Sequence, residues 1–241
     1  MQRILADHER GLTAEHEAYN YILTSIRAGR YAPGDRLIAD EIAAAIDMSR
    51  MPVREAFRRL ATEGLVQLRP NRGCVVSGLT IDEIFEVFAI RAVLEGLAIR
   101  LAMPHIDSAA LEELERRLAL MQQKEAARDD WIACHYEFHD YLYSLCGRRR
   151  LIRQIRTQHV IVEPYLRIYF HHVEKKRTAD EAHRVLFKEI KSGDASRAEQ
   201  AMRDHVSGTA PLLAAFIEKK DGAHWKAAIA TQSRSTSTKP R

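Results

Sequence analysis

The spacing of apolar residues constrains the fold of this chain more than any other feature, because it is helical along most of the 241 residues. Apolar side chains recur at i, i+3, i+4 and i+7, the pattern of an amphipathic helix. The segment Leu65–Val76 departs from it, with two short strand-like runs around a turn rich in Pro, Asn and Gly. We therefore expect a mostly α-helical protein with one small hairpin.

The first 78 residues predict three helices followed by a two-stranded hairpin. Ser49 is placed to cap the third helix, and Gly64 marks its end. This order is typical of a winged helix-turn-helix domain, covering 1–78. The expected helices are 12–26, 39–45 and 50–63, and the expected strands are 65–68 and 74–76.

From residue 79 to 222 the pattern is helical throughout and predicts an all-α bundle of about six helices. Residues 223–241 are rich in Ser, Thr, Lys, Pro and Arg and predict a disordered basic tail. The expected helices of the bundle are roughly 80–103, 107–128, 129–146, 148–175, 178–192 and 194–220.

The net charge of +4 does not by itself indicate nucleic-acid binding. The tail from Ala223 carries four basic residues and no acid, and the basic and acidic residues of the rest of the chain are equal in number. Cys74, Cys134 and Cys146 lack the CxxC spacing of a thiolate metal site, so buried thiols are expected. With no apolar run long enough for a membrane span and no secretory leader pattern, we expect a cytoplasmic protein without a membrane partner.

Local patterning in the third helix does indicate DNA. Arg50, Arg54 and Arg58 recur every four residues, so they drift only about 40° around the helix at each step. Their face is separate from the apolar stripe that begins at Val53. A solvated charged face is the alternative for such a stripe. The position of the helix, after two others and before a hairpin, favours a major-groove reading element.

Two further elements predict contacts with the minor groove and the phosphates of DNA. Arg72 at the tip of the hairpin can enter the minor groove, and Gly73 lets the backbone approach a phosphate. Arg36, placed at the start of the second helix, is a further phosphate candidate.

The blocks PGDRL, SRMPVREAFRRLATEGLV and RGCVV, between Pro33 and Val76, resemble the winged helix-turn-helix of GntR-type transcription regulators. The resemblance implies that Ser49, Arg50, Met51 and Arg54 contact bases and phosphates, and that Arg72 and Gly73 make the wing contact. The chain departs from the family at Met51, where threonine is usual, and at Asp40, where some relatives carry arginine. At Ile46-Asp47-Met48 a Leu-Gly-Val turn is more typical.

Seven of the eleven histidines lie between His135 and His205. His135 and His139 share one helix face at i, i+4 spacing, within chelating reach of one ion. His183 and His205 lie on successive antiparallel helices and come level across the Ser192-Gly193-Asp194 break. The spacing leaves two alternatives, a metal site and ordinary core histidines; for His159, His171 and His172 surface or core roles are expected.

The region Ile81–Ala215, through RAVLEGLAIRLA, EFHDYLYSLCG and AHRVLFKEIKSGDASRAEQAMRDHV, resembles the FCD-type ligand-binding domain of FadR-like GntR regulators. In metal-binding members an aspartate and three histidines hold a divalent ion. His139, His183 and His205 match the histidine positions, and His135 stands in place of the aspartate. The resemblance implies a zinc, nickel or similar ion, and a metal-free domain is the alternative because some relatives lack the metal.

By analogy with this family, Arg91 is the candidate for binding the effector, a small organic acid, beside the metal. Its alternative role is an i, i+4 ion pair with Glu95. Together these features predict a ligand-responsive homodimeric regulator of operator DNA that acts as a repressor and not as an enzyme. A hydrolase with Glu137 or Asp140 as general base, and a metal-storage module, are the rival functions, and neither explains the arginine helix.

Overall fold

The computed structural model describes residues 2–69, 73–124, 128–172 and 176–218. The protein is mostly helical with one small sheet, as predicted, and divides into two compact units, of which the second comprises Ile81–Phe216. In the described residues, none of the helices combines the length and the apolar character that crossing a bilayer requires. The predicted tail, 223–241, lies outside the described residues.

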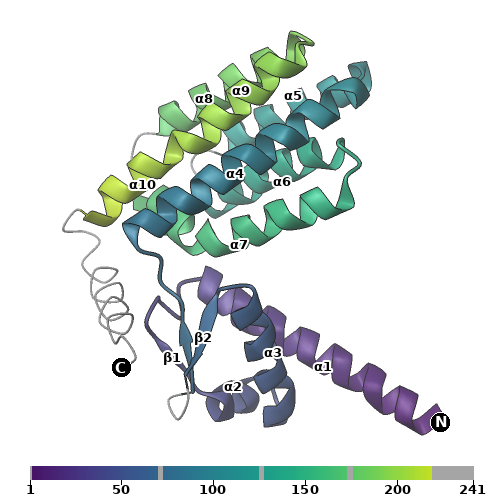
Figure 1. Cartoon of the computed structure of the whole chain (residues 1–241), viewed down its shortest axis with the longest axis vertical. Helices are drawn as coiled ribbons and strands as arrows, with labels where there is room; N and C mark the ends of the chain where they lie inside the picture. Colours follow the sequence, from purple (N-terminus) through teal and green to yellow (C-terminus); the bar gives the residue numbers. More distant parts are fainter. Residues whose placement is uncertain (1, 70–72, 125–127, 173–175, 219–241) are drawn as a thin grey trace, which may run out of the picture. The chain divides into compact units, whose positions relative to one another are not determined.

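The N-terminal unit contains three helices and a three-stranded antiparallel sheet with strand order β1-β3-β2 (Figure 1). The prediction of a two-stranded wing was therefore incomplete. Arg36 lies in the additional strand, where it pairs with Val75, and not at the start of the second helix. The elements are α1 (Gln2–Arg27), β1 (Arg36–Leu37), α2 (Ala39–Ala45), α3 (Arg50–Thr62), β2 (Val66–Arg69) and β3 (Gly73–Val76).

The apolar face of α3 fixes the direction of its charged face. Val53, Ala56, Phe57 and Leu60 are buried, and α3 packs against α1 and α2. Burial of such side chains stabilises each by about 1.5–3 kcal/mol relative to exposure, so the rotation of the helix is firmly set. The arginines that alternate with this stripe consequently face solvent.

The turn between α2 and α3 is built without glycine. Asp47 has φ of 51°, in the left-handed region that glycine adopts without a steric cost. Ser49 occupies the N-cap position of α3 with an extended backbone, but its side chain makes no capping hydrogen bond. The predicted side-chain cap is therefore wrong, although the helix begins where expected.

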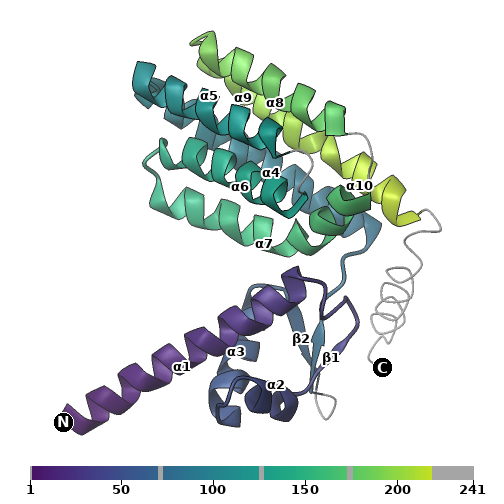
Figure 2. The ribbon, with the colours of Figure 1, turned by 180° about the vertical axis from the view of Figure 1, so that it is seen from behind.

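The C-terminal unit is a helical bundle in which α4 contacts α6, α7 and α9 (Figures 1 and 2). Gly96 permits the close approach of α4 to α9, because a Cβ there would lie 2.8 Å from Cγ of Arg203. The elements are α4 (Ile81–Ala102), η1 (Met103–His105), α5 (Ser108–Gln123), α6 (Arg128–Ser144), α7 (Arg149–His172), α8 (Lys176–Lys191), α9 (Ala195–Ser207) and α10 (Thr209–Glu218).

Two of the expected bundle helices differ from the observed ones. The single helix expected over 194–220 is two helices, α9 and α10, separated at Gly208. Pro211 explains the break, because it has no N–H to donate to the carbonyl of Ser207. The helix expected over 107–128 ends at Gln123, with Lys124 as its C-cap.

Candidate nucleic-acid interface and metal centre

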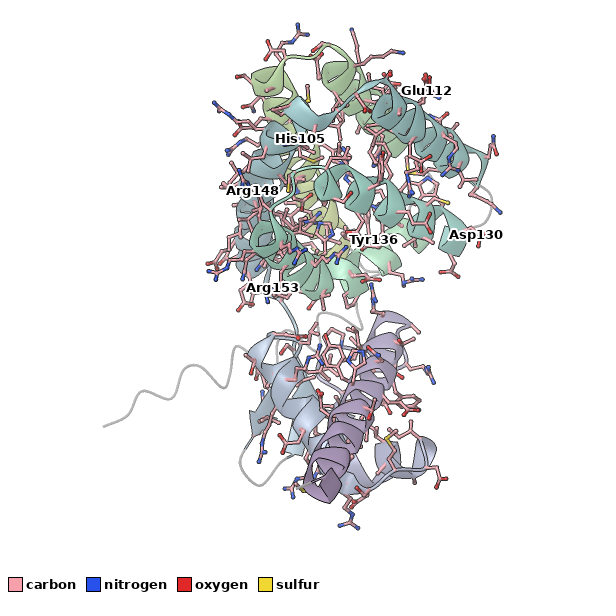
Figure 3. The ribbon with its side chains drawn as sticks, turned by 90° about the vertical axis from the view of Figure 1, so that its right-hand side faces the viewer. His105, Glu112, Asp130, Tyr136, Arg148 and Arg153 are labelled. Atoms are coloured by element: carbon pink, nitrogen blue, oxygen red, sulfur yellow. The ribbon has the colours of Figure 1, made fainter. Side chains whose placement is uncertain are left out.

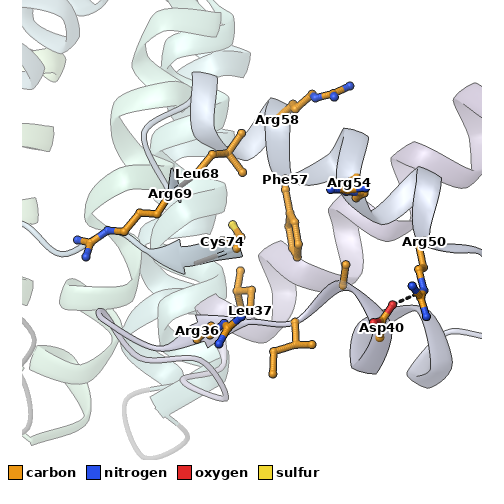
Figure 4. A pocket seen from close by; sticks show the side chains of 13 residues that line it. Arg36, Leu37, Asp40, Arg50, Arg54, Phe57, Arg58, Leu68, Arg69 and Cys74 are labelled. Atoms are coloured by element: carbon orange, nitrogen blue, oxygen red, sulfur yellow. Dashed lines mark ion pairs between the residues drawn. The ribbon is translucent and has the colours of Figure 1, made fainter. Parts of the chain in front are cut away.

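A cavity of about 690 Å³ lies on the surface of the N-terminal unit, formed by α2, α3 and the sheet (Figure 4). We call it the arginine groove. Its charged lining residues are Arg36, Arg50, Arg54, Arg58, Arg69 and Asp40. Five arginines against one aspartate make the lining of this groove cationic, which suits the phosphates and guanine edges of duplex DNA.

The structure brings most of the predicted DNA contacts to this groove. Arg36, Arg50, Arg54, Arg58 and Gly73 all line it. Arg69, on β2, was not predicted; it lies in the groove because a β-hairpin folds back over α3. Two of the predicted residues do not line the groove: Met51 is 62% exposed on the first turn of α3, and Ser49 is the N-cap of that helix. Arg72 is outside the described residues.

Gly73 has a backbone conformation in the left-handed region. Its φ is 78°, and an added Cβ would lie 3.6 Å from Nε of Arg36. The first residue of β3 therefore lies beside an arginine side chain in a geometry that only glycine adopts easily.

The four predicted histidines lie together inside the C-terminal unit. His135 and His139 come from α6, His183 from α8 and His205 from α9, and one ring nitrogen of each lies within 4.8 Å of the others. We call them the histidine cluster. Nε2 of His139 lies 3.1 Å from Nε2 of His183. Two nitrogens bound to one ion at about 2.1 Å are separated by about 3.0–3.4 Å, so this distance fits a shared ion.

Three histidines of the cluster, His135, His139 and His205, are held in the neutral form that metal binding requires. Burial, followed by the neighbouring imidazoles, lowers the pKa of His135 and of His139 well below the ordinary value. Burial and His183 lower the pKa of His205 to about 3. Nδ1 of His135 and Nδ1 of His205 are buried and find no hydrogen-bond partner among the described residues. These unpartnered nitrogens fit a site that a metal or ligand completes.

A hydrogen-bonded chain orients one of these imidazoles. The hydroxyl of Tyr143 donates to Oε2 of Glu95 and lies 3.1 Å from Nδ1 of His139. Since the hydroxyl proton is directed at the carboxylate, Nδ1 of His139 carries the hydrogen in this arrangement. The lone pair of Nε2 then faces His183 and the centre of the cluster, as a metal-ligating histidine requires.

The same carboxylate anchors a buried charge network beside the cluster. Nε of Arg91 donates to Oε1 of Glu95 at 2.8 Å, and Nε2 of His159 lies 2.8 Å from the same oxygen. Burial alone raises the pKa of Glu95, but Arg91 and His159 outweigh it and hold the pKa far below its ordinary value. The alternative expected for Arg91, an ion pair with Glu95, is confirmed.

Three members of this network were not predicted: Glu95 as an anchor, Tyr143 and His159. His159 was expected in a surface or core role, and it is a buried partner of Glu95. The relevant contacts join residues 48 to 68 positions apart, and no local pattern encodes them. The side chains of His171 and His172 lie outside the described residues.

Two family models match the chain. Residues 14–76 match the bacterial regulatory proteins of the gntR family, and residues 86–208 match the FCD domain. The chain belongs to the GntR family of regulators and carries an FCD domain. It is thus a transcriptional regulator of this family.

Named relatives support this family assignment, and a solved structure supports the fold. The chain is 30% identical over 204 residues to a probable D-xylose utilization operon transcriptional repressor of Paenarthrobacter nicotinovorans, covering 84% of this chain and 89% of the relative. It is 29% identical over 179 residues to the transcriptional repressor RspR of Escherichia coli, covering 73% and 78%. The fold is similar to that of E. coli McbR/YncC, with a TM-score of 0.72 and 24% identity over 83% of this chain and 96% of that one.

These relatives are DNA-binding regulators and not enzymes, so the hydrolase alternative gains no support. The geometry agrees with this conclusion. Both acids considered as a general base are exposed and lie near arginines: Glu137 is 3.9 Å from Arg117 and Asp140 is 3.2 Å from Arg156.

Proposed function

We propose that this regulator is a repressor that reads operator DNA with the arginine groove and the exposed first turn of α3. The observation that carries the proposal is the gathering of five arginines from α3 and the sheet in one groove. Arginine forks fit the O6/N7 edge of guanine, and neighbouring guanidiniums fit phosphates. Two named relatives are described as repressors, which supports repression.

Competition binding with labelled duplexes selected from a random library tests this role. Arg50→Ala together with Arg54→Ala should weaken binding at least about 30-fold, since each bidentate base contact contributes about 1–3 kcal/mol. Arg149→Ala with Arg153→Ala is the matched control, because these arginines are exposed at the same spacing on α7. Specific binding that survives the first pair of substitutions would contradict the proposal.

We further propose that the histidine cluster holds a divalent ion such as zinc or nickel, through His135, His139, His183 and His205. Support comes from the approach of the four imidazoles, the neutral form of His135, His139 and His205, and the donor set itself, since imidazole nitrogen suits both metals. When bound, the ion supplies a positive charge and a coordination position for an anionic oxygen. The surrounding residues orient the imidazoles, as Glu95 and Tyr143 do for His139.

Arg91 is proposed as the group that binds the carboxylate of the effector. Nη1 of Arg91 is buried and unpartnered among the described residues, although Nε is held by Glu95. A buried donor without an acceptor costs about 1–3 kcal/mol, and a small carboxylate supplies the missing acceptor. Citrate is a suitable probe: it should raise the melting temperature of the zinc-loaded chain, and an absent shift with a panel of small carboxylates would contradict this role.

A homodimer is proposed through an exposed apolar stripe on α4. Ile90, Val93 and Leu97 follow i, i+3, i+7 spacing and are 41%, 51% and 39% exposed. Contiguous apolar side chains of this kind are typical of protein interfaces. Val93→Glu should halve the sedimenting mass, whereas Val185→Glu, at a similarly exposed valine on α8, should not. Equal masses for both variants would contradict this interface.

A further inference from the structure

The arginine groove contains one acid among its described lining residues, and that acid contacts a predicted base-reading arginine. Oδ1 of Asp40, in the first turn of α2, forms an ion pair with Nε of Arg50, at the start of α3 (Figure 4). The side chains are 55% and 73% exposed, so the pair lies on the surface that meets a ligand and not in the core. An exposed pair of this kind contributes little to stability, and its position inside the groove calls for another role.

The atom that Asp40 engages determines what remains available on Arg50. With Nε occupied, the two terminal nitrogens still form a fork, and this is the fork that pairs end-on with O6 and N7 of guanine. The carboxylate also restricts the rotamers of a long side chain before DNA arrives, which reduces the entropy lost on binding. Its negative charge opposes a phosphate at the same place. Asp40 thus favours base reading by Arg50 over a backbone contact.

We propose that Asp40 is a specificity-determining residue, which holds Arg50 for guanine and so sets the base preference at one position of each half-site. This inference rests on the proposed reading of DNA by the arginine groove. It predicts that Asp40 contributes to discrimination between bases and not to overall affinity, since loss of a negative charge strengthens attraction to DNA in general.

Selection from a duplex library with a randomised core, followed by sequencing, tests the inference on the full chain. Asp40→Asn should reduce the preference for guanine at one position of each half-site about tenfold, the effect of one good base contact. The affinity of Asp40→Asn for random-sequence duplex should equal or exceed that of the unaltered chain. Arg50→Lys should lose the same preference while keeping the charge, because an ammonium has no planar fork.

Glu41→Gln is the matched control: it removes the same charge from the neighbouring exposed position of α2, outside the groove lining. It should select the same sequence as the unaltered chain. If Asp40→Asn also selects that sequence with unchanged preference, the role of Asp40 is overturned while DNA reading stands. If the unaltered chain selects no sequence, the proposed function itself fails. Unchanged melting temperatures exclude misfolding of these exposed variants.

Discussion

The arginine groove and the histidine cluster differ in how their side chains relate to the fold. In the groove, the arginine side chains of α3 project into solvent; the side chain of Arg50 is 73% exposed. In the C-terminal unit, His139 and His183 are 3% and 1% exposed and lie in the core beside the Arg91–Glu95 pair. One site lies on the surface of its unit, and the other is part of the packing of its unit.

This difference separates binding from stability in the first site and couples them in the second. Exposed ion pairs contribute about 0–1 kcal/mol, so the groove can change its residues without loss of fold. Buried charges and unpartnered buried polar groups cost several kcal/mol when a partner is removed. A ligand that completes the second site therefore stabilises the whole unit.

The largest expected effect on stability follows from Glu95→Gln. The substitution removes the charge that Arg91 and His159 face and leaves a buried guanidinium uncompensated. We expect a loss of about 3–5 kcal/mol in the free energy of unfolding, measured by urea denaturation. Glu86→Gln, exposed on the same helix, should change it by less than about 0.5 kcal/mol. Equal losses in the free energy of unfolding for the two substitutions would contradict the role of the buried charge network in stability.

The same carboxylate predicts an acid dependence. The pKa of Glu95 in the folded chain lies below its ordinary value of 4.5. As the pH falls, Glu95 is therefore protonated in the unfolded chain before it is protonated in the folded chain. The stabilisation that ionised Glu95 provides is therefore complete above its pKa in the unfolded chain. It declines as the pH falls toward its pKa in the folded chain. The difference in unfolding free energy between the unaltered chain and Glu95→Gln should narrow below about pH 4.5. A difference in unfolding free energy that stays constant through this pH range would contradict the predicted acid dependence.

Zinc should give the next largest effect. At a free concentration 100 times Kd, one bound ion raises the free energy of unfolding by about 2.7 kcal/mol. His139→Ala with His183→Ala should abolish this gain and retain DNA binding. His105→Ala is the control, because His105 is exposed on η1 (Figure 3). A gain that persists in the double variant would place the zinc elsewhere.

A smaller effect is expected in the turn between α2 and α3. Asp47→Gly removes a side chain from a residue with φ of 51°. Since the strain it relieves exceeds the added freedom of the unfolded chain, we expect a stabilisation of about 0.5–1 kcal/mol in thermal unfolding. Gly29→Ala, at φ of 72°, should have the opposite sign. A destabilised Asp47→Gly variant would show that the aspartate side chain stabilises the turn.

The smallest effect on stability should come from the groove itself. Arg50→Ala with Arg54→Ala removes two exposed side chains, so the free energy of unfolding should change by less than about 0.5 kcal/mol while DNA binding is lost. Calorimetry measures this change. A loss of several kcal/mol would show that the groove, like the cluster, is part of the packing.

The sequence predicts those features that repeat locally. The stripe of Val53, Ala56 and Leu60 determines which face of α3 carries arginine, and the antiparallel pairing of α8 with α9 brings His183 level with His205. It does not predict β1, a two-residue strand that exists only because β3 pairs with it from a distance. The contacts of Glu95 with Tyr143 and His159 were missed for the same reason: they depend on how α4, α6 and α7 pack.

Calorimetric zinc titration of the purified, metal-stripped chain tests most directly whether the buried histidine cluster binds a metal ion. We expect one zinc ion bound per chain, with binding lost in His139→Ala with His183→Ala and retained in His105→Ala. A chain that binds no zinc and no nickel, or a double variant that binds as well as the unaltered chain, would contradict a metal centre at the histidine cluster.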